Sequence, residues 1–232
     1  MSAWAWASLV LGWLALAALA QAARRASPID GDLRAGLAML ALRSWARLVH
    51  RLRVEGRDAL PRSRRPGPLL VVANHVSGAD PLLIQAACPF PIRWLMARDM
   101  RWRSVEPALD WAGVISVDRT RGTGAGVRPA LRALRAGEVV GVFPEGRLGP
   151  TPGVLEPFQP GVGALVARSR CPVLPVVVQR EPRAPDARSA LWRPSRSRVR
   201  FLPVIGPADL PDEPDSITRS VRALLEREIR RR

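Results

Sequence analysis

The chain has 232 residues, of which 47% are hydrophobic, and its formal net charge is +16. This length suits one α/β domain with a sizeable core, and the hydrophobic content excludes a disordered chain. The positive charge, carried entirely by Arg, favours anionic partners such as lipid headgroups, nucleic acid or phosphorylated substrates. Cys88 and Cys171 lie far apart and outside any Cys/His cluster, so neither a disulfide framework nor a metal site is expected.

Residues 2–23 carry no charged side chain, and their length is close to the roughly 20 residues that a bilayer core requires. Arg24 and Arg25 follow at once, which by the positive-inside rule holds the downstream chain in the cytoplasm. A signal peptide is the rival interpretation, since "AQA" at 20–22 resembles a cleavage site, but no positive segment precedes the apolar run. We therefore predict a retained anchor, with a buried soluble helix as the third alternative.

A second helical pattern covers residues 37–52. At helical spacing one face collects Leu37, Ala41, Trp45, Leu48 and Leu52, and another collects Arg43, Arg47 and Arg51. Directly after an apolar anchor, this pattern predicts a basic amphipathic helix lying on anionic lipid; the alternative is an ordinary surface helix with a solvated basic face. We place the anchor and this helix in residues 1–52 and an α/β domain in residues 53–232. His50 is interpreted as structural or exposed, without a catalytic role.

The rest of the chain alternates short apolar runs with helical patterns. We predict strands at 69–73, 92–97, 114–117, 139–143, 173–178 and 199–205. We predict helices at 81–88, 126–136 and 215–232, and Pro/Arg-rich loops at 61–68 and 180–198. Buried strands that alternate with helices are typical of an α/β fold with a largely parallel or mixed sheet flanked by helices.

Polar residues follow two of these strands. Asn74, the chain's one Asn, and His75 come directly after the strand at 69–73, and Asp80 lies five residues beyond His75. "PEG" at 144–146 follows the strand at 139–143. In α/β sheets the chemistry gathers at the carboxyl ends of strands, so these groups are expected to share one edge.

Each residue of this cluster also has a plain structural interpretation. Asp80 precedes Pro81 and could cap the next helix, Asn74 could be a turn residue, and His75 could be a core histidine. A His oriented by a carboxylate is, however, the usual arrangement of a general base, because the acid fixes the tautomer and favours the imidazolium. We therefore favour a catalytic role.

Four stretches resemble the blocks of the glycerolipid acyltransferases, the family of 1-acylglycerol-3-phosphate acyltransferases. "NHVSGAD" (74–80) is similar to the N-H-x-S-x-x-D motif, and "FPEG" (143–146) is similar to the third block. "LEPFQPGVGALVA" (155–167) is similar to the stretch that follows the third block. "GVISVDR" (113–119) resembles the second block and "CPVLPVVV" (171–178) the fourth. The four blocks occur in order, and the resemblance spans roughly residues 52 to 178.

The resemblance implies acyl transfer from acyl-CoA or acyl-carrier protein to the hydroxyl of a lysophospholipid, most simply 1-acylglycerol-3-phosphate. His75 is then the base and Asp80 orients it, with no enzyme nucleophile and no metal or redox cofactor. The substrate-binding residues it implies are Asn74, Ser77, Arg98, Arg119, Glu145, Gly146 and Arg147. It also implies membrane lipids as partners and the cytoplasmic face of a bacterial inner membrane as the location, with no nucleic-acid partner.

One departure from the family pattern bears on the acceptor. The family reads F-P-E-G-T-R-S, whereas this chain reads "FPEGRLG" from Phe143, so that Arg147 comes one place early. Arg147 can still grip a phosphate, or the acceptor can be another lyso-lipid such as a lyso-ornithine lipid. Two further alternatives stay open: a lipid-binding protein that has lost catalysis, and a nucleic-acid-binding protein suggested by the charge.

Overall fold

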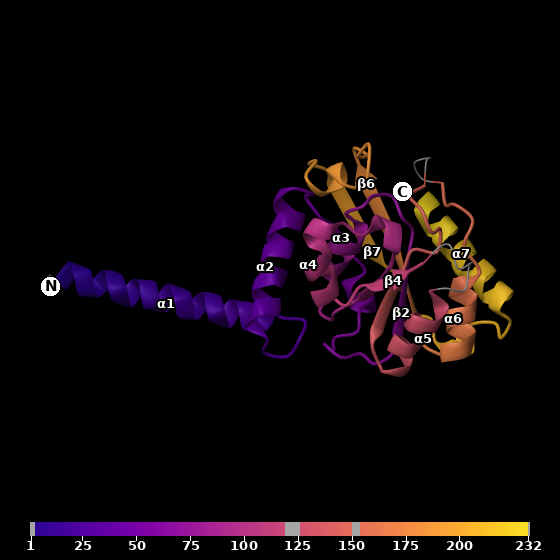
Figure 1. The fold of residues 1–232 in the computed structure, drawn as a ribbon, viewed down its shortest axis with the longest axis horizontal. Coiled ribbons are helices and arrows are strands. Elements are labelled where there is room, and N and C mark those ends of the chain that lie inside the picture. The colour runs from indigo at the N-terminus through magenta and orange to yellow at the C-terminus, as the bar shows by residue number, and fades with distance from the viewer. Residues whose placement is uncertain (1–2, 119–125, 150–153, 232) are drawn as a thin grey trace.

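The computed structural model describes residues 3–118, 126–149 and 154–231 (Figure 1). Its helices are α1 (Ala3–Ala26), α2 (Leu33–Leu48), α3 (Asp80–Ala87), α4 (Glu106–Trp111), α5 (Val127–Arg135), α6 (Gly161–Ser169) and α7 (Pro214–Arg230). Its strands are β1 (Arg53–Glu55), β2 (Leu69–Ala73), β3 (Arg93–Ala97), β4 (Ile115–Val117), β5 (Val139–Val142), β6 (Val173–Glu181) and β7 (Arg196–Phe201).

The strands of the described residues form one mixed sheet in the order β1-β7-β6-β2-β5-β3-β4. Every pair is parallel except β6 and β7, which run antiparallel. β2 and β5 lie in the middle, and all of their residues are buried, as expected for strands covered by helices on both faces. The predicted fold class is therefore confirmed.

Side chains of the central strands alternate between two cores because successive residues of a strand point to opposite faces. Leu70 and Val72 of β2 pack in the core formed with α5, α6 and α7. Val71 and Ala73 pack in the other core, which α3 and the end of α2 complete. In Figure 1 the two helical layers accordingly lie on opposite sides of the sheet.

The predicted strands all appear, although several boundaries differ. β6 continues to Glu181 and β7 begins at Arg196, so both enter the 180–198 stretch that we predicted as a loop. β1, α4 and α6 were not predicted. β1 has only three residues and is recognised by its backbone pairing with β7, a long-range contact that no local pattern indicates.

The N-terminal helix α1 projects away from the sheet (Figure 1). Its residues Trp4–Ala26 form a helix long and apolar enough to cross a membrane by length and composition, and the most apolar 18-residue part of it contains no buried residue. Its 24 residues extend about 36 Å at 1.5 Å per residue. A signal sequence has the same length and composition, so that alternative stays open.

α2 packs across the end of α1 and also contacts α3. Gly36 makes the first contact possible, because a Cβ there would lie 2.0 Å from the backbone oxygen of Ala23. Leu37 and Leu48, both in the predicted apolar row, are exposed at 42% and 81%. The buried side of α2 instead consists of Ala35, Gly36, Met39 and Ala46.

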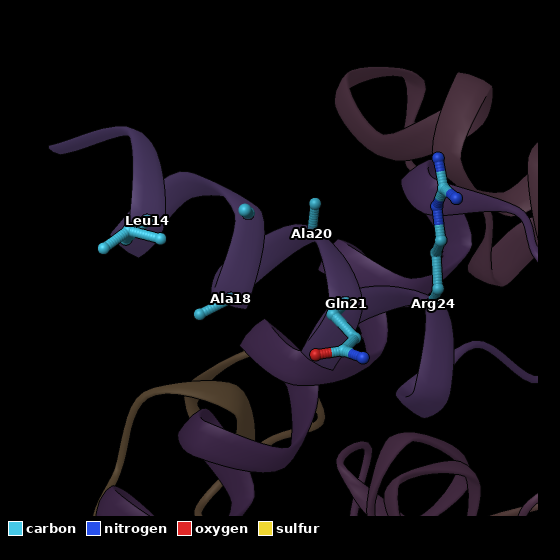
Figure 2. A pocket seen from close by; sticks show the side chains of 6 residues that line it. Leu14, Ala18, Ala20, Gln21 and Arg24 are labelled. Carbon is cyan, nitrogen blue, oxygen red and sulfur yellow. The ribbon is translucent and has the colours of Figure 1, made fainter. Parts of the chain in front are cut away.

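A hollow of about 560 Å³ runs along α1 (Figure 2). Its lining residues all belong to this helix: Leu14, Ala17, Ala18, Ala20, Gln21 and Arg24. A hollow with walls from a single exposed helix cannot enclose a substrate, and it includes no residue of the predicted motifs. The residues of the predicted motifs lie elsewhere, at the sheet edge where β2 and β5 end.

Candidate active site

The polar residues after β2 and β5 share one edge of the sheet. The two strands pair in parallel, with Val72 opposite Val142, so that both end at the same level. The peptide N–H of His75, after β2, donates to Oε1 of Glu145, after β5, at 2.7 Å. The expectation that the two strand ends lie together is thus met by a direct hydrogen bond.

The carboxylate of Asp80 is the centre of the first motif. Its Oδ2 lies 2.9 Å from Nδ1 of His75 and accepts the peptide N–H groups of Val76 and Ser77 at 2.7 and 2.8 Å. Its Oδ1 accepts the Ser77 hydroxyl at 2.6 Å, and the side chain is fully buried. Asp80 is the first residue of α3 rather than its cap, which is Ala79, so the capping alternative does not describe this carboxylate.

The imidazole of His75 is held at one nitrogen and along one face. A carboxylate only accepts hydrogen bonds, so the tautomer that fits the geometry carries its proton on Nδ1 and donates to Asp80. The ring stacks on Phe143, with centroids 4.0 Å apart and an interplanar angle of 15°. The His75 side chain exposes 19% of its surface to solvent, so the ring can be reached from outside.

The amide of Asn74 joins β2 to β6. Its Nδ2 donates to the backbone oxygen of Val178 at 2.9 Å, and its Oδ1 accepts the backbone N–H of the same residue at 2.7 Å. Asn74 thereby continues the parallel pairing one residue beyond the end of β2, in a way that a side chain without both donor and acceptor could not. Its contact with a substrate stays a prediction.

Glu145 is buried and bridges two segments. Besides His75, its carboxylate accepts the peptide N–H of Glu156 at 3.0 Å. Burial raises the pKa of the Glu145 carboxyl above its usual value, and the hydrogen bonds from the two peptide N–H groups oppose this shift. The Glu145 carboxylate therefore holds the backbone of His75 and that of Glu156 together through two hydrogen bonds.

Gly146 and Arg147, which follow Glu145 in the "FPEGR" stretch, are both exposed. Gly146 has φ of 69°, a conformation that side chains disfavour and glycine permits. The guanidinium of Arg147, 68% exposed, donates from Nη2 to Oε2 of Glu156 at 2.7 Å. Arg147 is thus exposed near Glu145 in sequence and has an acidic partner in Glu156.

The remaining predicted substrate-binding residues differ in position. The Ser77 hydroxyl is buried and bonds Asp80, so its described contact is within the motif. Arg98 lies exposed in the short turn that follows β3. Arg119 lies outside the described residues.

The segment after β6 borders the site, and the sequence did not indicate this. Ala187 lies against Gly78, where an added Cβ would come within 2.3 Å of the Ala187 backbone oxygen. Arg183 donates from Nη2 to the backbone oxygen of Gly149 at 2.9 Å, and the Gly149 N–H donates to the His75 oxygen at 3.3 Å. The local sign of this contact in the sequence is Gly78 of "NHVSGAD", because the absence of a side chain there permits the close approach of the Ala187 backbone.

This arrangement can perform proton transfer at a partly exposed imidazole. A buried carboxylate orients the ring through Nδ1, which leaves Nε2 on the opposite side to exchange a proton with a substrate. Within residues 3–118, 126–149 and 154–231, no three His, Cys, Asp or Glu side chains come together as a metal site requires. The two cysteines are buried and unpaired.

Comparison with known proteins identifies the family of the chain and a structure of similar fold. The family model described as "Acyltransferase" matches residues 51–179, more than half of the chain. In fold, the chain is similar to the crystal structure of the 1-acyl-sn-glycerophosphate (LPA) acyltransferase, PlsC, from Thermotoga maritima. The TM-score is 0.68 at 18% identity, over 88% of this chain and 83% of that chain. The matched region contains both motifs, and the chain belongs to the acyltransferase family.

Proposed function

We propose that this acyltransferase moves a fatty acyl group from acyl-CoA or acyl-carrier protein to the free hydroxyl of 1-acylglycerol-3-phosphate, giving phosphatidic acid. The observation that carries this proposal is the His75–Asp80 pair, 2.9 Å apart at the edge where the family's motifs meet. The name of the structurally similar Thermotoga protein supports a lysophosphatidic acid acceptor.

In the proposed reaction, Nε2 of His75 takes the proton of the acceptor hydroxyl while its oxygen attacks the thioester carbonyl. A C–O bond forms, and the tetrahedral intermediate then expels the thiolate as the C–S bond breaks. The imidazolium returns its proton to the departing sulfur, so no cofactor is consumed. Asp80 stabilises the imidazolium through Nδ1 in both steps. General acid–base catalysis by such a His and its carboxylate typically raises the rate by about 10²–10⁴-fold.

A phosphorylated acceptor requires cations near the reacting hydroxyl. We assign Arg147 to this role, with Gly146 supplying close backbone approach and Arg98 and Arg119 as further candidates. The ion pair between Arg147 and Glu156 is exposed on the Arg side, and such pairs are weak. A phosphate, which accepts Arg bidentately, can therefore compete for the guanidinium.

Arg147 stands one place earlier than the Arg of the family pattern, and this shift supports a second candidate acceptor, another lyso-lipid such as a lyso-ornithine lipid. The test is an assay of the purified chain in liposomes against a panel of lyso-lipids with acyl-CoA and with acyl-carrier protein. Conversion of 1-acylglycerol-3-phosphate with the highest kcat/KM supports the proposal. A higher value for an acceptor without phosphate contradicts it, and no transfer to any acceptor favours the non-catalytic lipid-binding alternative.

We further propose that α1 anchors the enzyme in a membrane, with the domain on the cytoplasmic face. The support is the uncovered apolar helix and the two arginines at its end. Deletion of residues 1–25 should move the protein from a salt-resistant membrane fraction to one that high salt releases, because only electrostatic attraction to anionic lipid then remains. A mature N-terminus near Ala23 would instead identify a cleaved signal peptide.

A further inference from the structure

Three neighbouring strands each contribute one ring to a continuous stack at the active-site edge. His75 follows β2, Phe143 follows β5, and Trp94 belongs to β3; β5 pairs with both of the other strands. The His75 and Phe143 centroids are 4.0 Å apart with planes at 15°, and those of Phe143 and Trp94 are 4.8 Å apart with planes at 11°. The three rings are therefore nearly parallel.

The far end of the stack is fixed by the sheet itself. Trp94 lies flat over Gly141 of β5, where an added Cβ would come within 2.5 Å of the indole ring. Glycine in the interior of a strand weakens the strand, and a common reason for its presence is the close approach of another group. Trp94 is 7% exposed, so it cannot swing away from Phe143 without opening the core.

The stack supplies the constraint that the hydrogen bond to Asp80 lacks. One hydrogen bond at Nδ1 holds that nitrogen but lets the imidazole plane tilt about the Nδ1···Oδ2 axis. A flat ring against one face removes this tilt and so fixes the direction in which Nε2 points. The face of a phenyl ring also carries partial negative charge, which attracts a positively charged group that lies over it.

The carboxylates that contact His75 do not hold the plane of its imidazole ring. Among the described residues, Asp80 faces Nδ1 from α3, and Glu145 bonds the His75 peptide N–H from the turn after β5. Both carboxylates act in the plane or on the backbone, and neither covers the ring face. Phe143 is the group that does.

We propose that Phe143 and Trp94 are positioning residues for His75, holding the imidazole plane so that Nε2 meets the acceptor hydroxyl. This inference rests on the proposed role of His75 as the base. It predicts that the rings affect the chemical step rather than acceptor binding. Removal of the aromatic face at residue 143 should therefore lower kcat and leave KM unchanged.

The test compares Phe143→Leu, which removes the ring, with Phe143→Tyr, which keeps it. We expect Phe143→Leu to lose roughly 3–30-fold in kcat, the range of a cation–π contact, and Phe143→Tyr to retain most activity. Phe90→Leu is the matched control, because Phe90 lies in the same core but beyond the other end of α3. It should lower thermal stability and leave the kcat of the folded enzyme unchanged.

Histidine NMR measures the stack without catalysis. The chain has two histidines, so labelled His gives two sets of ring signals, which His75→Ala assigns. Ring current from Phe143 should shift the His75 protons upfield in the wild type and in Phe143→Tyr, and Phe143→Leu should abolish the shift while the His50 signals stay.

The outcomes separate the two proposals. Wild-type kcat in folded Phe143→Leu, with His75→Ala inactive, overturns the stack and leaves the base intact. Activity in His75→Ala overturns the base. If Phe143→Leu does not fold, the wild-type spectrum decides, and His75 protons without an upfield shift overturn the stack.

Discussion

The chain's two histidines lie in regions with opposite electrostatics. His75 stands at the sheet edge with a carboxylate, Asp80, at Nδ1 and partial exposure. His50 is fully buried beyond the end of α2, where its Nδ1 contacts the Ser195 hydroxyl at 2.8 Å and a guanidinium nitrogen of Arg180 at 3.1 Å. The same side chain thus has an anionic carboxylate as its neighbour in one region and a cationic guanidinium in the other.

The comparison teaches how the neighbour decides what an imidazole can do. Burial and the nearby Arg180 lower the pKa of His50 to about 4, against the ordinary 6.5, so it stays neutral at physiological pH. Burial also lowers the pKa of Arg180. Within the described residues, Nε2 of His50 makes no well-formed hydrogen bond, although the Leu191 backbone lies near enough to oppose the lowered pKa, and the ring packs against Trp45 in the core. His75 instead contacts a carboxylate, because its Nδ1 lies 2.9 Å from Oδ2 of Asp80.

The largest effect that can break this comparison is removal of the acid. Asp80→Asn keeps the shape but removes the charge that stabilises the imidazolium, and we expect kcat to fall by about 10²-fold or more. Ser77→Ala is the milder control, because it removes one hydrogen bond to Oδ1 and leaves the carboxylate. If Asp80→Asn lowers the melting temperature and keeps its kcat, Asp80 supports the fold alone.

A cation near His75 should serve the substrate, in contrast to Arg180 beside His50. Arg147→Ala should lower kcat/KM for 1-acylglycerol-3-phosphate about 10–150-fold, as expected for a lost charge-assisted contact, and affect a monoacylglycerol much less. Glu156→Gln is the control, since it frees Arg147 from its ion pair and should not lower activity. Equal losses for both acceptors would assign Arg147 to the fold.

A third effect leaves turnover at neutral pH unchanged and is confined to stability at low pH. The unfolded chain binds a proton at His50 near pH 6.5, whereas the folded chain does so near pH 4. The contribution of neutral His50 is therefore complete above pH 6.5 and is lost as the pH falls toward 4, by about 3 kcal/mol in the free energy of unfolding. His50→Gln should lack this component in urea unfolding measured across that range. Parallel pH profiles for the two proteins would contradict the account of His50.

The sequence was informative where chemistry and local pattern coincide. A strand followed by Asn-His, with an acid five residues on, predicted the sheet edge and the pairing of His75 with Asp80, because an α/β sheet brings strand ends together. The two hydrogen bonds between the Asn74 side chain and the Val178 backbone could not be predicted, since they join residues that are distant in the chain. The ring stack was hidden for the same reason, although Gly141 inside an apolar strand was a local sign of close approach.

Helix α2 shows that helical periodicity alone does not determine which side of a helix packs on the rest of the chain. Its large apolar residues at helical spacing predicted one continuous apolar face, yet Leu37 and Leu48 of that row point outward. The helix buries small residues instead because α1 crosses it at backbone distance, as Gly36 against Ala23 requires. Whether the outward row meets lipid, as we predict, depends on a membrane rather than on contacts within the chain.

The most direct test of the central claim compares His75→Ala with His50→Ala in one assay. Thiol release from acyl-CoA and formation of phosphatidic acid from 1-acylglycerol-3-phosphate are measured together for the liposome-bound enzyme. The account predicts that His75→Ala folds and loses about 10²–10⁴-fold in kcat, whereas the folded fraction of His50→Ala retains its turnover. Near-normal turnover by His75→Ala would contradict the assignment of His75 as the base.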